Sequence, residues 1–225
     1  MLNRNKIKSD VIQSVNHCYD VEQNNLVQIG LHHRTEGEIR YAAGELVESV
    51  LKSIFTAINN NLSVEKIISK VGGSDYLKKE IVYKGVTYIN NTIQVDRHVW
   101  YKGKRIAFIE NKTYLDTCYY DRALADFKKI CQALEQEHKN PSDCLFIVFA
   151  GQKAGKDNTF LTYEAEFWYE TKSIMDSPNG IEPKTIYFLK GTRNSSRPLY
   201  KIKHQLDMDN ILNFVDIILD KIEQM

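Results

Sequence analysis

Asp96, Glu110 and Lys112 are the residues of this sequence whose types and spacing suggest chemistry. Two carboxylates that lie close together bind a hard divalent cation, typically Mg²⁺, through oxygen alone. Such a cation neutralises a phosphate and lowers the pKa of a bound water, and a nearby lysine can stabilise the negative charge that develops on phosphorus. The three residues therefore predict a metal-dependent site for phosphodiester hydrolysis, with Asp96 and Glu110 as metal ligands.

A β-hairpin is expected to bring these residues together. Two β-rich runs in residues 92–113 flank Lys102-Gly103-Lys104, a turn signal centred on glycine. A three-residue loop would place Asp96 directly opposite Glu110, and strand alternation puts Lys112 on the same face. A two-residue loop would place the two acids on opposite faces unless a β-bulge compensates.

The alternative interpretation is a surface ion pair across the hairpin, which is the commonest role of such residues. An apolar run, residues 106–109, leads directly into Glu110 and favours the catalytic interpretation, because unpaired charges beside a core are costly. His98 shares the face of Asp96 in this register, and a structural role is the simpler interpretation for it. Asp75 is a rival for the first acid, but Gly72 and Gly73 place it in a turn.

The surrounding sequence predicts the elements that position this hairpin. Thr35 and Glu38 match a capping box, and one apolar stripe follows as far as Ile58. The other expected elements are a short helix at 63–70, β-type runs from 81 to 113, a helix at 116–137, a strand at 144–150, a mixed helical stretch at 161–175, a strand at 185–189 and a helix at 209–222. This order predicts an α/β fold in which helices cover a central mixed sheet on both faces.

Asp96 followed by Glu110-Asn111-Lys112 at the end of an apolar strand resembles the PD-(D/E)xK motif of the restriction-endonuclease-like nucleases. In that superfamily the Asp and the Glu bind the metal, and the Lys assists the attacking water. A helix before the hairpin commonly carries a further Glu in a GxxxE-like pattern, and Glu48 matches it here. Helical projection places Glu48 at the edge of the apolar stripe and Glu45 nearly opposite. The sequence departs from the motif at Val95, where the family has proline.

The resemblance implies a single nuclease domain, residues 1–225, with a restriction-endonuclease-like core at about 35–151. Residues 1–34 and 152–225 would be additions for DNA contact or dimerisation. Within the superfamily the chain looks like a type II restriction endonuclease, a homodimer that needs Mg²⁺ and cuts double-stranded DNA at a specific sequence to leave 5′-phosphate ends. A recombination or repair nuclease such as a junction resolvase, and a catalytically inactive DNA-binding protein of the same fold, remain alternatives.

Two polar loops are candidates for DNA contact. Lys153 and Lys156 follow the apolar strand at 144–150, and an ordinary solvated loop is the alternative there. Arg193, Asn194 and Arg197 follow the last expected strand. Arginine and asparagine are suited to bidentate contacts with guanine and adenine edges, although an ordinary polar loop explains them equally well.

Composition adds little to this interpretation. The chain of 225 residues is 43% hydrophobic and 26% charged with a net charge of +1, which describes a globular protein but does not by itself suggest DNA. No long apolar run or secretory signal is evident, so a cytoplasmic location and no membrane are expected. The four cysteines lack a CxxC spacing, so neither a zinc site nor a disulfide framework is expected. Residues 151–156 lack the spacing of a phosphate-binding loop, so no nucleotide cofactor is expected.

Overall fold

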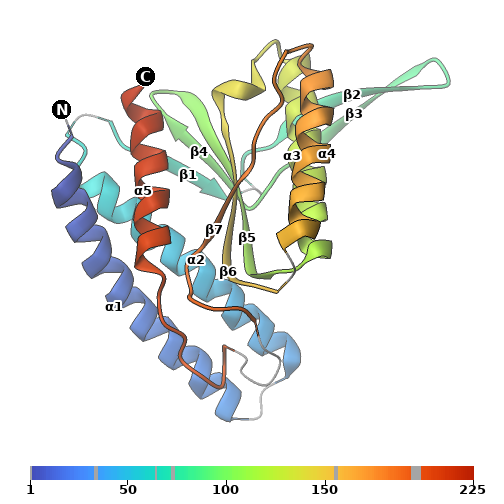
Figure 1. The fold of residues 1–225 in the computed structure, drawn as a ribbon. Helices are drawn as coiled ribbons and strands as arrows, with labels where there is room; N and C mark the ends of the chain where they lie inside the picture. Colours follow the sequence, from blue (N-terminus) through green and yellow to red (C-terminus); the bar gives the residue numbers. More distant parts are fainter. Residues whose placement is uncertain (1, 33–34, 64, 72–73, 155–156, 194–198) are drawn as a thin grey trace.

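The fold is built on a central mixed β-sheet with helices on both faces (Figure 1). The computed structural model describes residues 2–32, 35–63, 65–71, 74–154, 157–193 and 199–225. Its helices are α1 (Arg4–Leu31), α2 (Glu36–Asn60), α3 (Thr117–Gln136), α4 (Asp157–Ile174) and α5 (Met208–Glu223), with a short 3₁₀ turn at Pro141–Asp143. Its strands are β1 (Ile68–Val71), β2 (Leu77–Tyr83), β3 (Val86–Ile93), β4 (Arg97–Tyr101), β5 (Lys104–Leu115), β6 (Leu145–Lys153) and β7 (Lys184–Tyr187).

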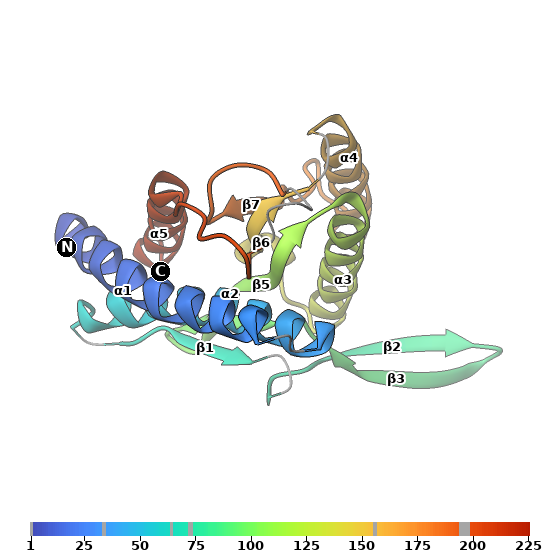
Figure 2. The same ribbon diagram turned by 90° about the horizontal axis from the view of Figure 1, so that it is seen from below.

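Five of these strands form the central sheet in the order β1-β4-β5-β6-β7. The pairs β1–β4 and β4–β5 are antiparallel, whereas β5–β6 and β6–β7 are parallel. The two faces of the sheet carry separate cores, one under α1, α2 and α5 and the other under α3 and α4 (Figure 2). The expectation of an α/β fold with a mixed, helix-covered sheet is therefore confirmed.

Burial on both faces explains the apolar strands at the centre of the sheet. Phe108 and Ile109 of β5 point to opposite cores, and Phe146 and Ile147 of β6 do the same. Strands between two helical layers need apolar side chains at consecutive positions, as parallel strands of α/β proteins commonly show. The predicted strand at 144–150 is thus the central part of β6.

Local signals at the helix ends also agree with the structure. The Thr35 side chain accepts the backbone N–H of Glu38, and the Glu38 carboxylate accepts the backbone N–H of Thr35, which completes the capping box of α2. Asp116 caps α3 by accepting the backbone N–H of Tyr119 at 2.9 Å. The two helices that flank the candidate site therefore begin at the residues that sequence patterns predict.

Two elements differ from the expectation. The predicted helix at 63–70 is wrong, because β1 occupies its second half and pairs with the edge of β4. An eight-residue helix gains little from its own hydrogen bonds, so pairing with an available strand prevails. The long helix α1 was not predicted; it buries a narrow stripe that includes Ile7, Val11 and Val15.

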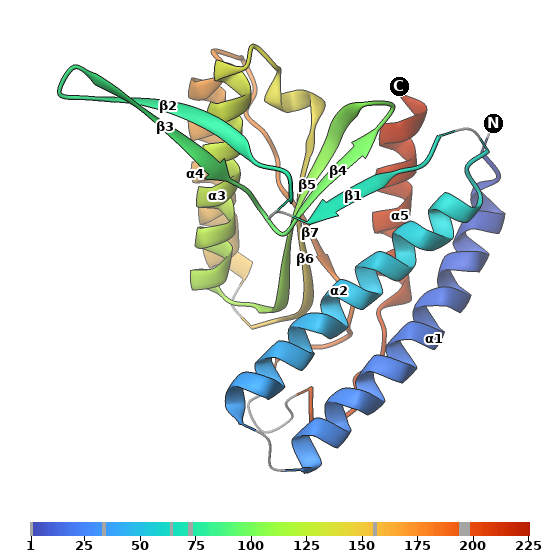
Figure 3. The same ribbon diagram turned by 180° about the vertical axis from the view of Figure 1, so that it is seen from behind.

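The hairpin of β2 and β3 forms a separate two-stranded sheet that projects from the body of the molecule (Figure 3). Its base is attached to α3, where Lys79 Nζ donates to Gln132 Oε1 at 2.5 Å. The side chain of Gln136 accepts the backbone N–H of Glu80 at 2.7 Å and donates to its carbonyl at 3.1 Å. The base of the hairpin is therefore fixed on α3.

None of the helices in the described part of the chain combines the length and apolar character of a membrane span.

Candidate active site

The hairpin of β4 and β5 brings Asp96 next to Glu110 by a different route from the expected one. Its turn has two residues, Lys102 and Gly103, both with positive φ, because Tyr101 pairs directly with Lys104. The expectation of a three-residue loop is therefore wrong. A bulge between Val99 and Trp100 compensates for the missing residue. Such a bulge is what a two-residue turn requires if both acids are to lie together.

Backbone hydrogen bonds fix the relation between the two acids. The register of Arg97 opposite Ile109 places Asp96, which precedes β4, beside Glu110. The backbone N–H of Asp96 donates to Glu110 Oε2 at 3.3 Å, and Asp96 Oδ2 accepts the backbone N–H of Asn111 at 2.7 Å. Lys112 Nζ donates to Glu110 Oε1 and forms an ion pair with it. Asp96, Glu110 and Lys112 are thus brought together.

Glu48 approaches the same place from α2. Its carboxylate forms an ion pair with Arg97, whose Nε donates to Glu48 Oε2 at 2.8 Å, and it accepts a hydrogen bond from the Asn111 side chain. Glu45, three residues earlier, is exposed. The helical projection that separated Glu48 from Glu45 agrees with this arrangement.

A hollow of about 250 Å³ opens between α2 and the strands at this point. Glu48, Asp96, Asn111 and Thr113 line it, together with further residues of α2, among them Glu45. Glu110 does not line this hollow, because alternation along β5 turns its side chain toward the opposite face from Asn111. Asp96 precedes β4, so strand alternation does not fix its side chain, which accepts the Asn111 backbone N–H and also lines the hollow.

Burial and like charge perturb both acids. Burial, followed by repulsion from Asp96, raises the pKa of Glu110, although Lys112 partly opposes this. Burial also raises the pKa of Asp96, where Glu48 adds to the effect and the Asn111 backbone N–H opposes it. The site holds three carboxylates, Glu48, Asp96 and Glu110, against two cations, and such an excess of buried negative charge attracts a further cation.

A divalent metal ion would compensate the excess negative charge of these residues. Their side chains are not arranged as a complete set of metal ligands. No group of three or more His, Cys, Asp or Glu side chains is positioned to hold a metal ion within the described ranges. Asp96 forms no ion pair with any residue that the structure describes, and Asn111 Oδ1 is buried without a hydrogen-bond partner among them. Asp96 and Glu110 supply the carboxylate oxygens that Mg²⁺ prefers, whereas the Asn111 side chain lies on the α2 side of β5, away from Glu110.

The candidate DNA-contact residues fall into two groups. Lys153 lies at the end of β6, and its carbonyl accepts the backbone N–H of Arg193 at 2.7 Å. The Arg193 guanidinium stacks on the ring of Tyr114, 3.4 Å from its centre. These residues gather at the carboxyl ends of the parallel strands. Lys156, Asn194 and Arg197 lie outside the described residues.

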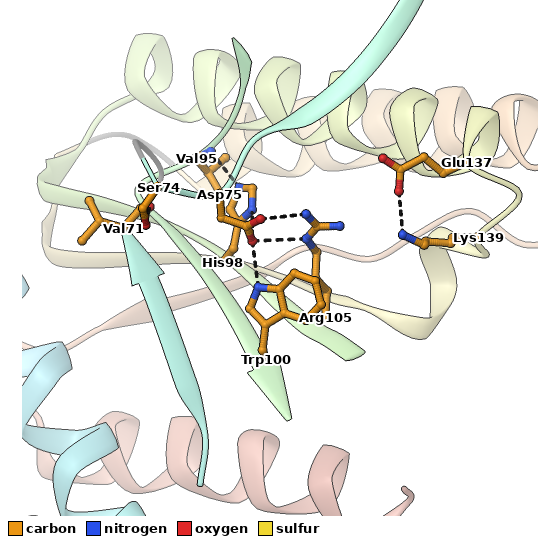
Figure 4. A network of polar contacts seen from close by, with 9 residues as sticks. All are labelled: Val71, Ser74, Asp75, Val95, His98, Trp100, Arg105, Glu137 and Lys139. Atoms are coloured by element: carbon orange, nitrogen blue, oxygen red, sulfur yellow. Dashed lines mark hydrogen bonds and ion pairs between the residues drawn. The ribbon is translucent and has the colours of Figure 1, made fainter. Parts of the chain in front are cut away.

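Asp75 belongs to a different network (Figure 4). Its carboxylate accepts from Trp100 Nε1 at 2.7 Å and from Arg105 Nη2 at 2.9 Å, and it contacts His98 Nδ1 at 3.1 Å. Burial raises the pKa of Asp75, but the hydrogen bonds from Arg105 and Trp100 outweigh it and leave this pKa below its ordinary value. This network ties the segment before β2 to the β4–β5 hairpin, and it does not include Glu110.

Fully buried His98 extends this network toward the candidate site. The Val95 backbone N–H points at His98 Nε2 at 3.5 Å, while His98 Nδ1 faces Asp75. The simpler structural interpretation of His98 therefore agrees with its contacts. The sequence signal that could have revealed this network was the alternation of His98 and Trp100 along one strand, opposite Arg105 on the next.

Comparisons with known proteins add no relative. No protein-family model matches the sequence, and no curated protein matches it either. The fold and the geometry of the site are therefore the observations from which a function has to be argued.

Proposed function

We propose that this protein is a Mg²⁺-dependent endonuclease that hydrolyses double-stranded DNA. The observation that carries the proposal is the placement of Asp96 beside Glu110 and Lys112, with Glu48 adjacent on α2. Four residues from three separate segments converge there on one end of a buried sheet. The order of these residues along the chain resembles the PD-(D/E)xK motif, and this resemblance supports the proposal.

Asp96 and Glu110 are the residues that would hold the metal, because both are acids with a raised pKa and an incomplete set of cationic partners. When bound, Mg²⁺ would neutralise the phosphate and make a water molecule more acidic. Lys112 is placed beside Glu110 and would stabilise the negative charge that grows on the phosphoryl oxygens. Glu48 and Asn111 would fix the α2 side of the site through their mutual hydrogen bond.

The proposed reaction is a hydrolysis. Water adds its oxygen to phosphorus, the bond between phosphorus and the 3′ oxygen breaks, and the leaving oxygen takes a proton. The products are a 5′-phosphate and a 3′-hydroxyl. Lys153 and Arg193, at the carboxyl ends of the strands, would contact phosphates of the duplex, since cationic side chains provide most of the contacts that position DNA.

Digestion of a plasmid of known sequence tests this proposal and separates its variants. Discrete fragments in Mg²⁺ would identify a sequence-specific enzyme of the type II restriction class. A smear, or preferential cutting of branched DNA, would assign the site to a general or repair nuclease. DNA binding without cleavage in Mg²⁺ or Mn²⁺ would favour an inactive binding protein of the same fold and would contradict the proposed activity.

A further inference from the structure

Among the residues that the structure describes, exposed large apolar side chains are most concentrated on and next to the β2–β3 hairpin. The described residues include sixteen exposed large hydrophobic side chains, and nine of them lie between Ile68 and Ile89. Six of the nine are on the hairpin, namely Ile81, Val82, Tyr83, Val86, Tyr88 and Ile89, and each is between 43% and 72% exposed. The other three, Ile68, Val71 and Tyr76, lie on β1 and in the segment that leads to β2.

These residues lie on elements that follow one another along the chain, namely β1, the segment 74–76, β2 and β3. Figures 2 and 3 show β1 and the hairpin following one another along the same side, with the hairpin reaching beyond the helices. Contiguous apolar surface on such a strip marks an interaction site more often than scattered single residues do. We call this surface the β1–hairpin strip, and it comprises β1, the segment 74–76, β2 and β3.

Cross-strand pairing gathers four of the apolar side chains on one face of the hairpin. Ile81 pairs directly with Tyr88, and Tyr83 pairs with Val86, so these four side chains share a face. An isolated two-stranded sheet is at best marginally stable in water, and its two free edges are templates for another chain. The base is fixed on α3 by Lys79 and Gln136, whereas the outer part has no covering layer among the described residues.

The charge of the outer hairpin argues for a protein partner over nucleic acid. Residues 81–95 contain no Asp or Glu, and Lys84 is their one charged residue. A surface that binds DNA needs several cations for the phosphates. A nearly uncharged, β-branched and aromatic ribbon without proline is instead suited to pairing with another copy of itself.

We propose that the β1–hairpin strip is the surface through which two copies of this chain associate. A two-fold arrangement would place the face of Ile81, Tyr83, Val86 and Tyr88 against the same face of the second copy, which makes the contact self-complementary. The nine exposed apolar side chains of the strip would form the apolar centre of such a contact. The nuclease resemblance implies a homodimer without saying which surface forms it; this inference assigns that surface, and it does not depend on the proposed activity.

Sedimentation of the full chain with and without added charge on the hairpin tests the proposal. The wild type is expected to sediment as a dimer of the 26.1 kDa chain at micromolar concentration without DNA or metal. The variant Tyr83→Glu/Tyr88→Glu is expected to be monomeric, with a dissociation constant raised about a hundredfold or more, because like charges would face each other across the two-fold axis.

Leu161→Glu is the matched control, since Leu161 is exposed to a similar degree but lies on α4, away from the strip. It should leave the dimer intact, and all three proteins should keep the same circular dichroism spectrum. A monomeric wild type, a dimer that survives the hairpin charges, or a dimer that both variants disrupt would overturn the proposal. If the wild type is monomeric and the hairpin substitutions change its affinity for DNA, the proposal is also overturned, and the hairpin is assigned to nucleic-acid binding.

Discussion

Main-chain donors hold the carboxylates of Asp96 and Glu110: Asp96 Oδ2 accepts the N–H of Asn111 at 2.7 Å, and Glu110 Oε2 accepts the N–H of Asp96 at 3.3 Å. Each acid is therefore oriented by the backbone of the neighbouring strand. Because an amide oxygen can accept the same hydrogen bonds, the isosteric changes Asp→Asn and Glu→Gln should remove charge with little loss of shape. This property makes the site suitable for separating charge from geometry.

Asp96→Asn is expected to stabilise the protein in metal-free buffer. The folded-state pKa of Asp96 is raised, chiefly by burial, so its ionised form costs stability at neutral pH, and that cost disappears as the group is protonated. Removing the charge should add about 0.5–2 kcal/mol to the free energy of unfolding, typical of relieving a functional site. Urea unfolding at pH 7 in EDTA measures it. A variant clearly less stable than the wild type would contradict this account of the site.

Mg²⁺ is expected to stabilise the wild type and to leave Asp96→Asn almost unaffected. A ligand that binds only the folded state raises stability with its concentration, and the carboxylate at position 96 is one of the two proposed metal ligands. Thermal unfolding over a range of Mg²⁺ concentrations gives the comparison. Equal shifts of the melting temperature in both proteins would show that the cation binds somewhere else.

The rate of cleavage should fall on the acid side at a pH above the ordinary carboxyl range of about 4. Burial and mutual repulsion raise the pKa values of Asp96 and Glu110, and both must be ionised to hold a cation. Protons and Mg²⁺ then compete, so a higher Mg²⁺ concentration should move the acid limb to lower pH. Single-turnover rates at two Mg²⁺ concentrations check this, and an acid limb that does not respond to Mg²⁺ would argue against these ligands.

Glu48 and Glu45 form a matched pair on α2. Both line the hollow beside α2, but Glu48 contacts Arg97 and Asn111 beside the acids, whereas Glu45 is exposed three residues earlier. Glu48→Gln should lower cleavage about 10–100-fold, the usual cost of altering a group that supports metal ligands, while Glu45→Gln should retain wild-type activity. Rates under identical conditions decide, and equal effects of the two changes would remove Glu48 from the site.

Asp75→Asn is expected to destabilise the fold by about 3–5 kcal/mol, because it leaves the Arg105 charge nearly buried without its partner. The folded-state pKa of Asp75 is depressed, so its contribution is present above the unfolded aspartate value of about 4 and is lost as pH falls through the folded value. Unfolding at pH 7 and pH 3.5, followed by tryptophan fluorescence, should show a smaller difference between variant and wild type at the lower pH. A constant difference would contradict this role.

Local patterns predicted the parts of the fold that depend on a few neighbouring residues. Thr35 and Glu38 cap α2, Asp116 caps α3, and the apolar run at 144–150 forms the buried centre of β6. The contact between Asp96 and Glu110 was also predicted, although by the wrong loop. The turn is one residue shorter than expected, and the bulge after Val99 restores the pairing that places Asp96 beside Glu110.

The parts of the fold that depend on contacts between distant residues could not be predicted from local patterns. The strand at Ile68–Val71 forms because it pairs with the edge of β4. The sequence of residues 63–70 contains no signal for that pairing. Asp75 lies between β1 and β2, outside the regular strands, and its contacts with Trp100 and Arg105 bridge 25 and 30 residues and follow from the fold. The exposed β2–β3 hairpin, too, is visible only once its side chains are seen to lack a covering layer.

Cleavage of supercoiled plasmid in Mg²⁺ by the wild type, Asp96→Asn, Glu110→Gln and Lys112→Ala tests the central claim most directly. Loss of an interaction made at the reacting phosphate typically costs at least about a hundredfold in rate, so all three variants should lose that much while they keep the wild-type circular dichroism spectrum. Wild-type rates in any of these folded variants, or a wild type that fails to cut DNA in Mg²⁺ and Mn²⁺, would contradict the assignment of Asp96, Glu110 and Lys112 as a nuclease site.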